Sequence, residues 1–152
     1  MLAESLLFAV LLIVIGQTQD ILFQQWTGGR LLIVFPPHAS ATAISYLGAG
    51  IYEEVLFRGI LCTLIYVAGR SLKLPIAVSL IVAMLASSLL FSAAHSIGPA
   101  ADSYTHYSFL FRTCAGVYFA GLFFCRGLAI AVGAHAVYDL LVGLLLPALM
   151  AA

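Results

Sequence analysis

The residues of this chain best suited to chemistry are six polar side chains that lie inside apolar stretches. They are Glu53, Glu54, Arg58, His95, His135 and Asp139. A charged side chain at the centre of a membrane helix costs about 2.5–3.5 kcal/mol on insertion scales, so such groups normally face a bundle interior or a wet cavity and mark a functional site. Because three separate apolar segments supply these side chains, the sequence predicts a common polar cavity that several helices build together.

The first of these segments carries two neighbouring carboxylates and an arginine. Glu54 and Arg58 are four residues apart and share one face of a helix, where they can form an ion pair that keeps Glu54 ionised. Glu53 is rotated by about 100° from Glu54 and has no partner within one turn. This position suits a general base that takes a proton from water. The alternative is an ion pair that only fixes the register of the helix.

The other two segments each carry a histidine. Phe91 and His95 are four residues apart, as are His135 and Asp139, so each pair shares a helix face. The Asp139 carboxylate can accept a hydrogen bond from one ring nitrogen of His135 and leave the other nitrogen for water or a metal ion. The alternatives are a packing role for His95 and, for the second pair, a polar clamp between helices that is typically worth only ~0.6 kcal/mol in membranes.

The composition indicates which elements must position these side chains. Hydrophobic residues make up 64% of the 152 residues and charged residues only 8%, whereas a soluble domain carries about 25% charged residues. Six basic and six acidic residues give no net charge. This balance excludes a nucleic-acid binder with a basic stripe and a polybasic membrane-surface protein. We therefore predict an all-α fold, a polytopic transmembrane helix bundle of about five spans with a four-helix catalytic core.

Apolar stretches of about 20 residues predict the individual spans. They lie at about residues 2–16, 41–68, 75–97, 107–125 and 128–146. The first span is short, and residues 17–40 form a mixed loop in which residues 31–35 are re-entrant or interfacial. Pro147 ends the last span. We divide the chain into an N-terminal span with its loop, residues 1–40, and a catalytic core, residues 41–150.

Three motifs in this order resemble those of the CAAX protease and bacteriocin-processing (CPBP) family of intramembrane proteases. The EExxxR motif of that family matches Glu53 to Arg58, its FxxxH motif matches Phe91 to His95, and its HxxxN or HxxxD motif matches His135 to Asp139. The resemblance covers about residues 44–146, with each motif in a separate apolar stretch. It implies an endopeptidase, of glutamic or metallo type, that acts within or at the membrane.

The resemblance also implies a role for each residue of the candidate site. Glu53 matches the glutamate that activates the attacking water, and His95 and His135 match histidines that position this water or bind a metal. A zinc ion held by Glu53, His95 and His135 would fit the three-ligand catalytic pattern, and a metal-free mechanism is the alternative. Asp139 would polarise the scissile carbonyl or support the site, but a carboxylate donates a hydrogen bond only when protonated, whereas Asn donates directly.

The resemblance implies a supporting role for Glu54 and Arg58, which would stabilise the site or act as secondary ligands. It also implies the partners and the location of the protein. The expected partners are membrane lipid and protein or peptide substrates, lipidated CAAX proteins among them, with no nucleic acid. We expect a multi-pass protein of a bacterial or archaeal plasma membrane.

Three other functions compete with proteolysis. A non-catalytic binding or bacteriocin-immunity protein would use the polar residues for packing or ligand capture only. An ion or proton translocator would use them as a relay, but inverted repeats or broken helices, expected for that class, are not visible in the sequence. Thiol transfer by Cys114 near Arg112 lacks a neighbouring base. The three cysteines, Cys62, Cys114 and Cys125, have no CxxC spacing and are predicted to be small buried hydrophobes.

Overall fold

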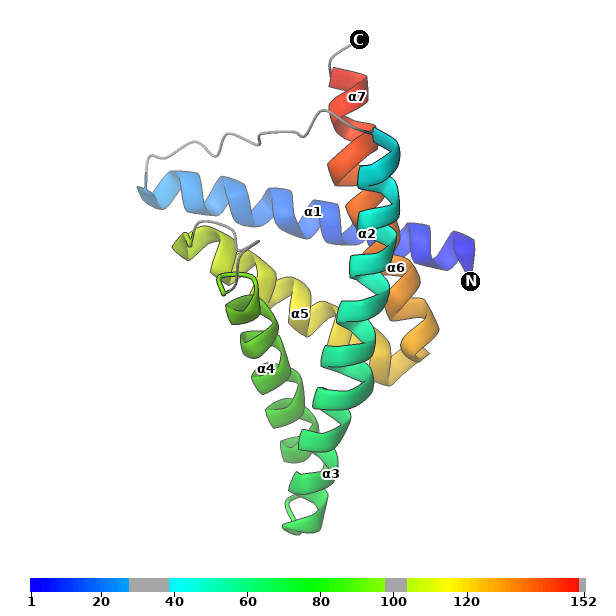
Figure 1. Ribbon diagram of the computed structural model, residues 1–152. Helices are drawn as coiled ribbons and strands as arrows, with labels where there is room; N and C mark the ends of the chain where they lie inside the picture. The colour runs from blue at the N-terminus through cyan, green and yellow to red at the C-terminus, as the bar shows by residue number, and fades with distance from the viewer. Residues whose placement is uncertain (28–38, 98–103, 151–152) are drawn as a thin grey trace. The chain divides into compact units, whose positions relative to one another are not determined.

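The computed structural model describes residues 1–27, 39–97 and 104–150, and every regular element among them is a helix (Figure 1). The elements are α1 (Leu2–Thr27), α2 (Ala39–Glu54), the π-helical η1 (Val55–Cys62), α3 (Thr63–Ser71), α4 (Ile76–Ala94), α5 (His106–Arg126), α6 (Leu128–Leu140), the π-helical η2 (Leu141–Leu145) and α7 (Leu146–Met150). The predicted all-α, helical membrane fold is confirmed.

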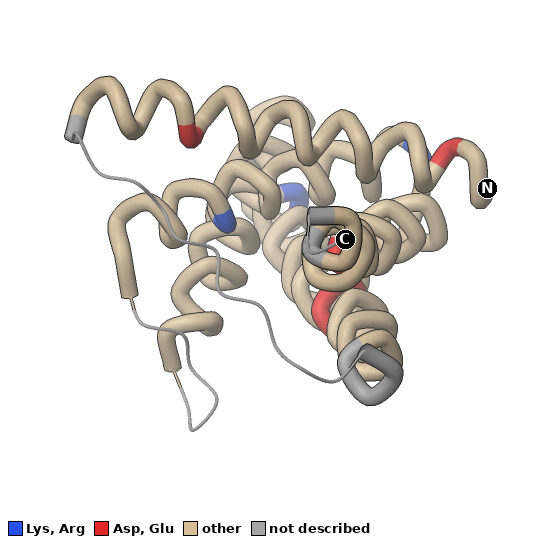
Figure 2. Tube along the Cα trace, turned by 90° about the horizontal axis from the view of Figure 1, so that it is seen from above, with Lys and Arg blue, Asp and Glu red and all other residues tan. Residues whose placement is uncertain are grey.

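Four helical segments are long and apolar enough to cross a membrane. They are Leu2–Trp26, Ile76–Ala94, His106–Arg126 and Leu128–Leu145. Large apolar side chains such as Leu7, Ile81 and Leu110 are exposed along them, and charged residues are few along the described chain (Figure 2). Such surfaces need lipid around them, because exposed apolar area of this extent is unfavourable in water.

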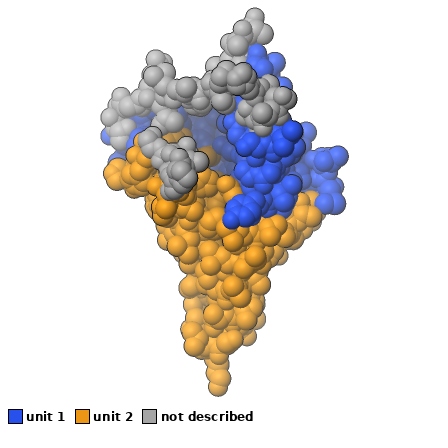
Figure 3. All heavy atoms as spheres, in the orientation of Figure 1, with its two compact units in different colours: residues 1–52, 132–152 blue, residues 53–131 orange. Residues whose placement is uncertain are grey.

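The chain divides into two compact units (Figure 3). Unit 2 contains residues 53–131, and unit 1 contains residues 1–52 and 132–152. Unit 2 therefore holds the first two motifs, and unit 1 holds the third.

Small residues let the helices of unit 2 approach closely. A Cβ atom on Gly69 of α3 would lie 2.9 Å from Ser79 Oγ of α4, and one on Gly116 of α5 would lie 2.8 Å from Ser88 Cβ of α4. Both serines are buried. Helices in membranes associate through such small-residue contacts, because the hydrophobic effect does not drive their association in lipid.

Unit 1 uses the same kind of contact. A Cβ atom on Gly50 of α2 would lie 3.2 Å from Ala136 Cα of α6, and one on Gly143 of η2 would overlap the Tyr46 ring. The face of α2 that carries Tyr46 and Gly50 thus packs directly against α6 and η2, next to the position of His135.

The first helix is longer than the sequence analysis predicts. It continues past residue 16 to Thr27, so the loop prediction is wrong for residues 17–27. Two of their polar side chains form hydrogen bonds within the helix: Thr18 Oγ1 donates to the Val14 carbonyl at 2.8 Å, and Gln24 Nε2 donates to Asp20 Oδ2 at 2.7 Å. The rest of that loop, with the predicted re-entrant residues 31–35, lies outside the described residues up to Ala39, where α2 begins.

The second of the five predicted spans is an uninterrupted helical segment made of α2, η1 and α3, but it is not among the four segments that are long and apolar enough to cross a membrane. The sequence does not predict its π-helical middle part, in which the wider turn changes the partners of the backbone carbonyls. Thr63 Oγ1 donates to the carbonyl of Arg58, five residues earlier, at 3.2 Å. Such single wide turns inside α-helices are frequent at functional sites.

Two predicted helix ends differ from the structure. The last apolar span ends at Leu145, next to its predicted end, but helical structure continues past Pro147 to Met150, and wide turns such as η2 are one way in which membrane helices accommodate the missing N–H of proline. Helix α4 ends at Ala94 rather than near residue 97. Ser96 and Ile97 then bond the carbonyls of Ala93 and Ala94 in tight turns, so His95 follows the last residue of the helix.

The cysteines differ from one another in burial. Cys62 is buried as predicted, but Cys114 and Cys125 are exposed on α5. The prediction fails for these two because an apolar residue of a membrane helix can face lipid as readily as a protein core.

Candidate active site

The candidate residues of unit 2 lie at the junction of α2 and η1 and at the C-terminal end of α4. Glu53 and Glu54 end α2, Arg58 follows in η1, and His95 caps the C-terminal end of α4. The contact between η1 and α4 brings these positions together within one unit.

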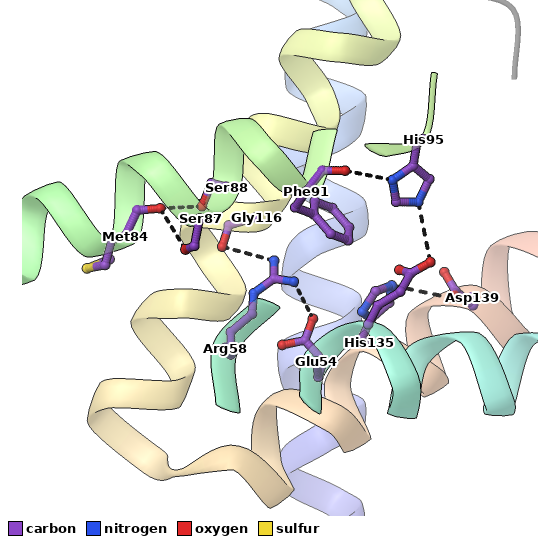
Figure 4. Close-up of polar contacts among 11 residues, drawn as sticks. Glu54, Arg58, Met84, Ser87, Ser88, Phe91, His95, Gly116, His135 and Asp139 are labelled. Carbon is purple, nitrogen blue, oxygen red and sulfur yellow. Dashed lines mark hydrogen bonds and ion pairs between the residues drawn. The ribbon is translucent and has the colours of Figure 1, made fainter. Parts of the chain in front are cut away.

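The predicted pairing of Glu54 with Arg58 is confirmed. Arg58 Nη1 lies 3.0 Å from Glu54 Oε1, and both side chains are fully buried. Arg58 Nη2 also donates a hydrogen bond to the Gly116 carbonyl of α5 at 3.2 Å (Figure 4). The guanidinium therefore joins η1 to a helix that carries none of the three motifs.

Two aromatic rings complete the surroundings of Arg58. Its guanidinium carbon lies 4.4 Å from the ring centroid of Phe91 on α4 and 5.6 Å from that of Phe119 on α5. Cation–π contacts of this kind are strongest when the cation is desolvated. Arg58 thus contacts α2, α4 and α5, and its charge is balanced by Glu54, a carbonyl and two ring faces.

Sequence reasoning does not identify Gly116 or Phe119 as neighbours of Arg58. Gly116 is 58 residues from Arg58 in the chain, and its contribution is a backbone carbonyl that any residue type possesses. The one signal available in the sequence is a glycine in the middle of an apolar span, which indicates close approach of another helix.

Glu53 has a partner on another helix. Its Oε1 lies 3.5 Å from Nε2 of His95, and the two side chains are 20% and 24% exposed. The sequence analysis assigns Glu53 no partner within its own turn, and the structure brings one from the end of α4. Because both groups are partly exposed, a substrate or water molecule can reach them, in contrast to the buried Glu54–Arg58 pair.

The hydrogen bond at the other ring nitrogen of His95 determines what Nε2 can do. Nδ1 of His95 lies 2.9 Å from the Phe91 carbonyl (Figure 4). A carbonyl only accepts hydrogen bonds, so Nδ1 carries the proton, and a neutral imidazole then presents the Nε2 lone pair to Glu53. Two acceptors that face each other need a hydrogen-bond donor or a cation shared between them, and a water molecule has the donors required.

Unit 1 contains the third candidate pair. His135 Nε2 lies 3.6 Å from Asp139 Oδ2, one turn later on α6, so the two groups are neighbours as predicted, whereas the predicted hydrogen bond stays a prediction because this distance is beyond hydrogen-bonding range. His135 is buried, whereas Asp139 is partly exposed. The cavity that the sequence analysis predicts for all six residues stays a prediction.

A catalytic zinc ion needs more protein ligands than the Glu53–His95 pair supplies. Catalytic zinc sites use three protein ligands. Among residues 1–27, 39–97 and 104–150, no group of three or more His, Cys, Asp or Glu side chains is placed so that it could hold a metal ion. The predicted zinc set of Glu53, His95 and His135 remains a prediction.

Comparison with known proteins agrees with the three motifs. The model of the type II CAAX prenyl endopeptidase Rce1-like family matches residues 1–141. No curated protein and no solved structure gives a significant match. Because the family match spans all three motifs and the four apolar helices support the same setting, the chain is an integral membrane protein of the Rce1-like CAAX prenyl endopeptidase family, a family of membrane proteases.

Proposed function

We propose that this protein is an endopeptidase that hydrolyses membrane-associated or CAAX-type protein substrates with a water molecule activated by Glu53. The observation that carries the proposal is the partly exposed Glu53–His95 pair, 3.5 Å apart, beside a fully buried Glu54–Arg58 pair. The family match supports peptide-bond hydrolysis in a membrane setting. A lipidated substrate and a bacterial or archaeal plasma membrane are part of the proposal and follow from the resemblance.

The proposed reaction uses the two acceptors that face each other. A water molecule donates hydrogen bonds to Glu53 and to Nε2 of His95. Glu53 takes one proton from this water while the water oxygen attacks the scissile carbonyl carbon. A carbon–oxygen bond forms, and the carbonyl electron pair moves to the carbonyl oxygen. The tetrahedral intermediate then collapses with cleavage of the carbon–nitrogen bond. Glu53 returns the proton to the leaving amine, so one water molecule is consumed and a carboxylic acid and an amine are formed.

The remaining motif residues support this reaction. Glu54 and Arg58 fix the end of α2 and thereby the backbone that carries Glu53. His135 and Asp139 are included in the proposal through their motif, as groups that position water or polarise the scissile carbonyl. In the second of these roles Asp139 would have to be protonated, since a carboxylate only accepts hydrogen bonds.

The test compares new protein N-termini in host membranes that contain wild-type protein or Glu53→Gln at matched levels. We expect termini that occur only with wild type, because loss of a general base lowers turnover by about 10²- to 10⁴-fold. Glu4→Gln, which removes a carboxylate of α1 outside the motifs, serves as the control and is expected to match wild type. Identical sets of termini for folded wild type and Glu53→Gln would contradict the proposal and favour a binding or immunity role.

The metal question has its own test. Purified protein is treated with phenanthroline and then supplied with zinc while cleavage is measured. Loss of cleavage and its recovery with zinc would support a zinc-assisted reaction, for which Glu53, His95 and His135 are the predicted ligands. Unchanged cleavage in the chelator would support the metal-free reaction.

A further inference from the structure

We infer that Phe91 is a positioning residue of this peptidase: its ring, held by the buried Arg58 guanidinium, orients the His95 imidazole toward Glu53. The inference depends on the proposed function, because it assigns a task to a residue beside the proposed catalytic pair. In the sequence motif, Phe91 is defined only by its position four residues before His95. In the structure, its ring contacts the His95 imidazole.

Phe91 links the Glu54–Arg58 ion pair of unit 2 to the Glu53–His95 pair. Its side chain is 3% exposed. The guanidinium carbon of Arg58 lies 4.4 Å from its ring centroid, and the centroid of the His95 ring lies 4.7 Å from it at an interplanar angle of 69°. One aromatic ring therefore contacts both the buried cation and the imidazole that faces Glu53 (Figure 4).

A third contact restricts the rotation of the Phe91 ring. The ring of Phe57, which precedes Arg58 in η1, lies 5.3 Å from Phe91 at 83°, an edge-to-face arrangement. Edge-to-face pairs and cation–π contacts each prefer a particular ring orientation. Phe57 and Arg58 together thus define the orientation of the surface against which His95 rests.

His95 requires support of this kind because it follows the last residue of α4. Its backbone lies in the turn after the helix, where fewer backbone hydrogen bonds restrict the chain. Phe91 holds the imidazole at two points, by its carbonyl at Nδ1 and by its ring. The hydrogen bond selects the tautomer, and the ring limits rotation about the Cβ–Cγ bond of His95, so that Nε2 stays directed at Glu53.

Phe119 provides a matched control. It is 1% exposed and lies 5.6 Å from the Arg58 guanidinium carbon, but it belongs to α5. Phe119→Leu removes a buried ring from the same cation, as Phe91→Leu does. A merely structural role for Phe91 predicts similar effects of the two substitutions once folded protein is compared.

The experiment measures kcat and KM for a prenylated CAAX peptide, together with NMR spectra of ¹⁵N,¹³C-labelled histidine, in wild type, Phe91→Leu, Phe91→Tyr and Phe119→Leu. The His95 signals are assigned with His95→Gln. We expect Phe91→Leu to lower kcat by about 10- to 100-fold, the cost of a misplaced catalytic group, with KM within about threefold. The His95 carbon-bound ring protons should lose the shift caused by the neighbouring ring. Phe91→Tyr, which keeps the ring, and Phe119→Leu should retain kcat within about threefold.

Three results would overturn the inference: equal losses of kcat in Phe91→Leu and Phe119→Leu, a change in KM alone, or unchanged His95 signals in Phe91→Leu. Failure of the proposed function is distinguishable from these. If wild type leaves the peptide and host membrane proteins intact, the peptidase proposal is contradicted, and the His95 spectra alone decide whether Phe91 orients the imidazole.

Discussion

At the scale of single residues, Arg58 explains how a strongly charged group is accommodated inside this apolar chain. Pairing with an opposite charge offsets part of the cost of burying a charged group. Arg58 contacts the Glu54 carboxylate, the Gly116 carbonyl and the rings of Phe91 and Phe119. These partners come from three helices, so the arginine stabilises their arrangement as well as the carboxylate.

Arg58→Ala is expected to lower the stability of the protein strongly. It would leave Glu54 buried without its cation, at a cost of about 3–5 kcal/mol. Folded yield after detergent extraction and thermal unfolding followed by circular dichroism measure this effect. Arg70→Ala, which removes an exposed arginine at the end of α3, is the control and should unfold like wild type. A normal yield and melting temperature for Arg58→Ala would show that Glu54 has another partner or reaches water.

At the scale of secondary-structure elements, the site depends on close contact between α4 and α5. Ser88 of α4 packs against Gly116 of α5, and the carbonyl of the same glycine accepts a hydrogen bond from Arg58. The position of α5 therefore determines where the guanidinium can bind. Arg58 itself lies in the π-helical segment η1. The wide turn of η1 therefore lies beside the close contact between α4 and α5 at Gly116.

Gly116→Ala is expected to destabilise unit 2 by about 1–3 kcal/mol, the usual cost of overpacking. The new Cβ would lie 2.8 Å from Ser88 Cβ and 3.0 Å from Ser88 Cα, so the two helices must separate. Gly121→Ala is the matched control on α5, because its Cβ would lie 3.7 Å from the Met84 methyl carbon in an ordinary contact. Thermal unfolding of both variants measures the effect, and equal melting temperatures would show that α4 and α5 adapt without cost.

At the scale of the whole molecule, the main property is a surface that lipid must cover. Four segments are long and apolar enough to span a membrane, and the chain has only six basic and six acidic residues. The proposed substrates are located in the same membrane. The enclosing lipid also excludes bulk water, which strengthens electrostatic interactions within the site.

Reaction of the three cysteines with maleimides tests this placement. Cys125 is exposed next to the end of α5, Cys114 is exposed inside the span, and Cys62 is fully buried. In intact membranes we expect a water-soluble maleimide to modify Cys125 fastest and Cys114 slowly, because a polar reagent enters the hydrocarbon layer poorly. Cys62 should react only after denaturation. Mass spectrometry of the labelled protein gives the order, and rapid labelling of Cys114 would place α5 outside the hydrocarbon layer.

The amino-acid sequence by itself determined the features that depend on local spacing and composition. Apolar stretches predicted the helical membrane fold, and the four-residue spacings predicted the contacts of Glu54 with Arg58 and of His135 with Asp139, which the structure confirms. These predictions succeed because helix geometry alone brings residues four positions apart onto one face. Helix ends were less predictable, as α1 and Pro147 show, because intrahelical hydrogen bonds and wide turns accommodate residues that usually end a helix.

Only the tertiary structure decided which groups from distant segments meet. It pairs Glu53 with His95, and it brings the Gly116 carbonyl and the Phe119 ring to Arg58. No local pattern encodes these contacts, because they depend on how α4 and α5 pack through small residues and on the end of α4 at Ala94, which leaves His95 in the following turn. Periodicity identifies the face of a helix, but the packing partner of that face is determined by the shapes of both surfaces.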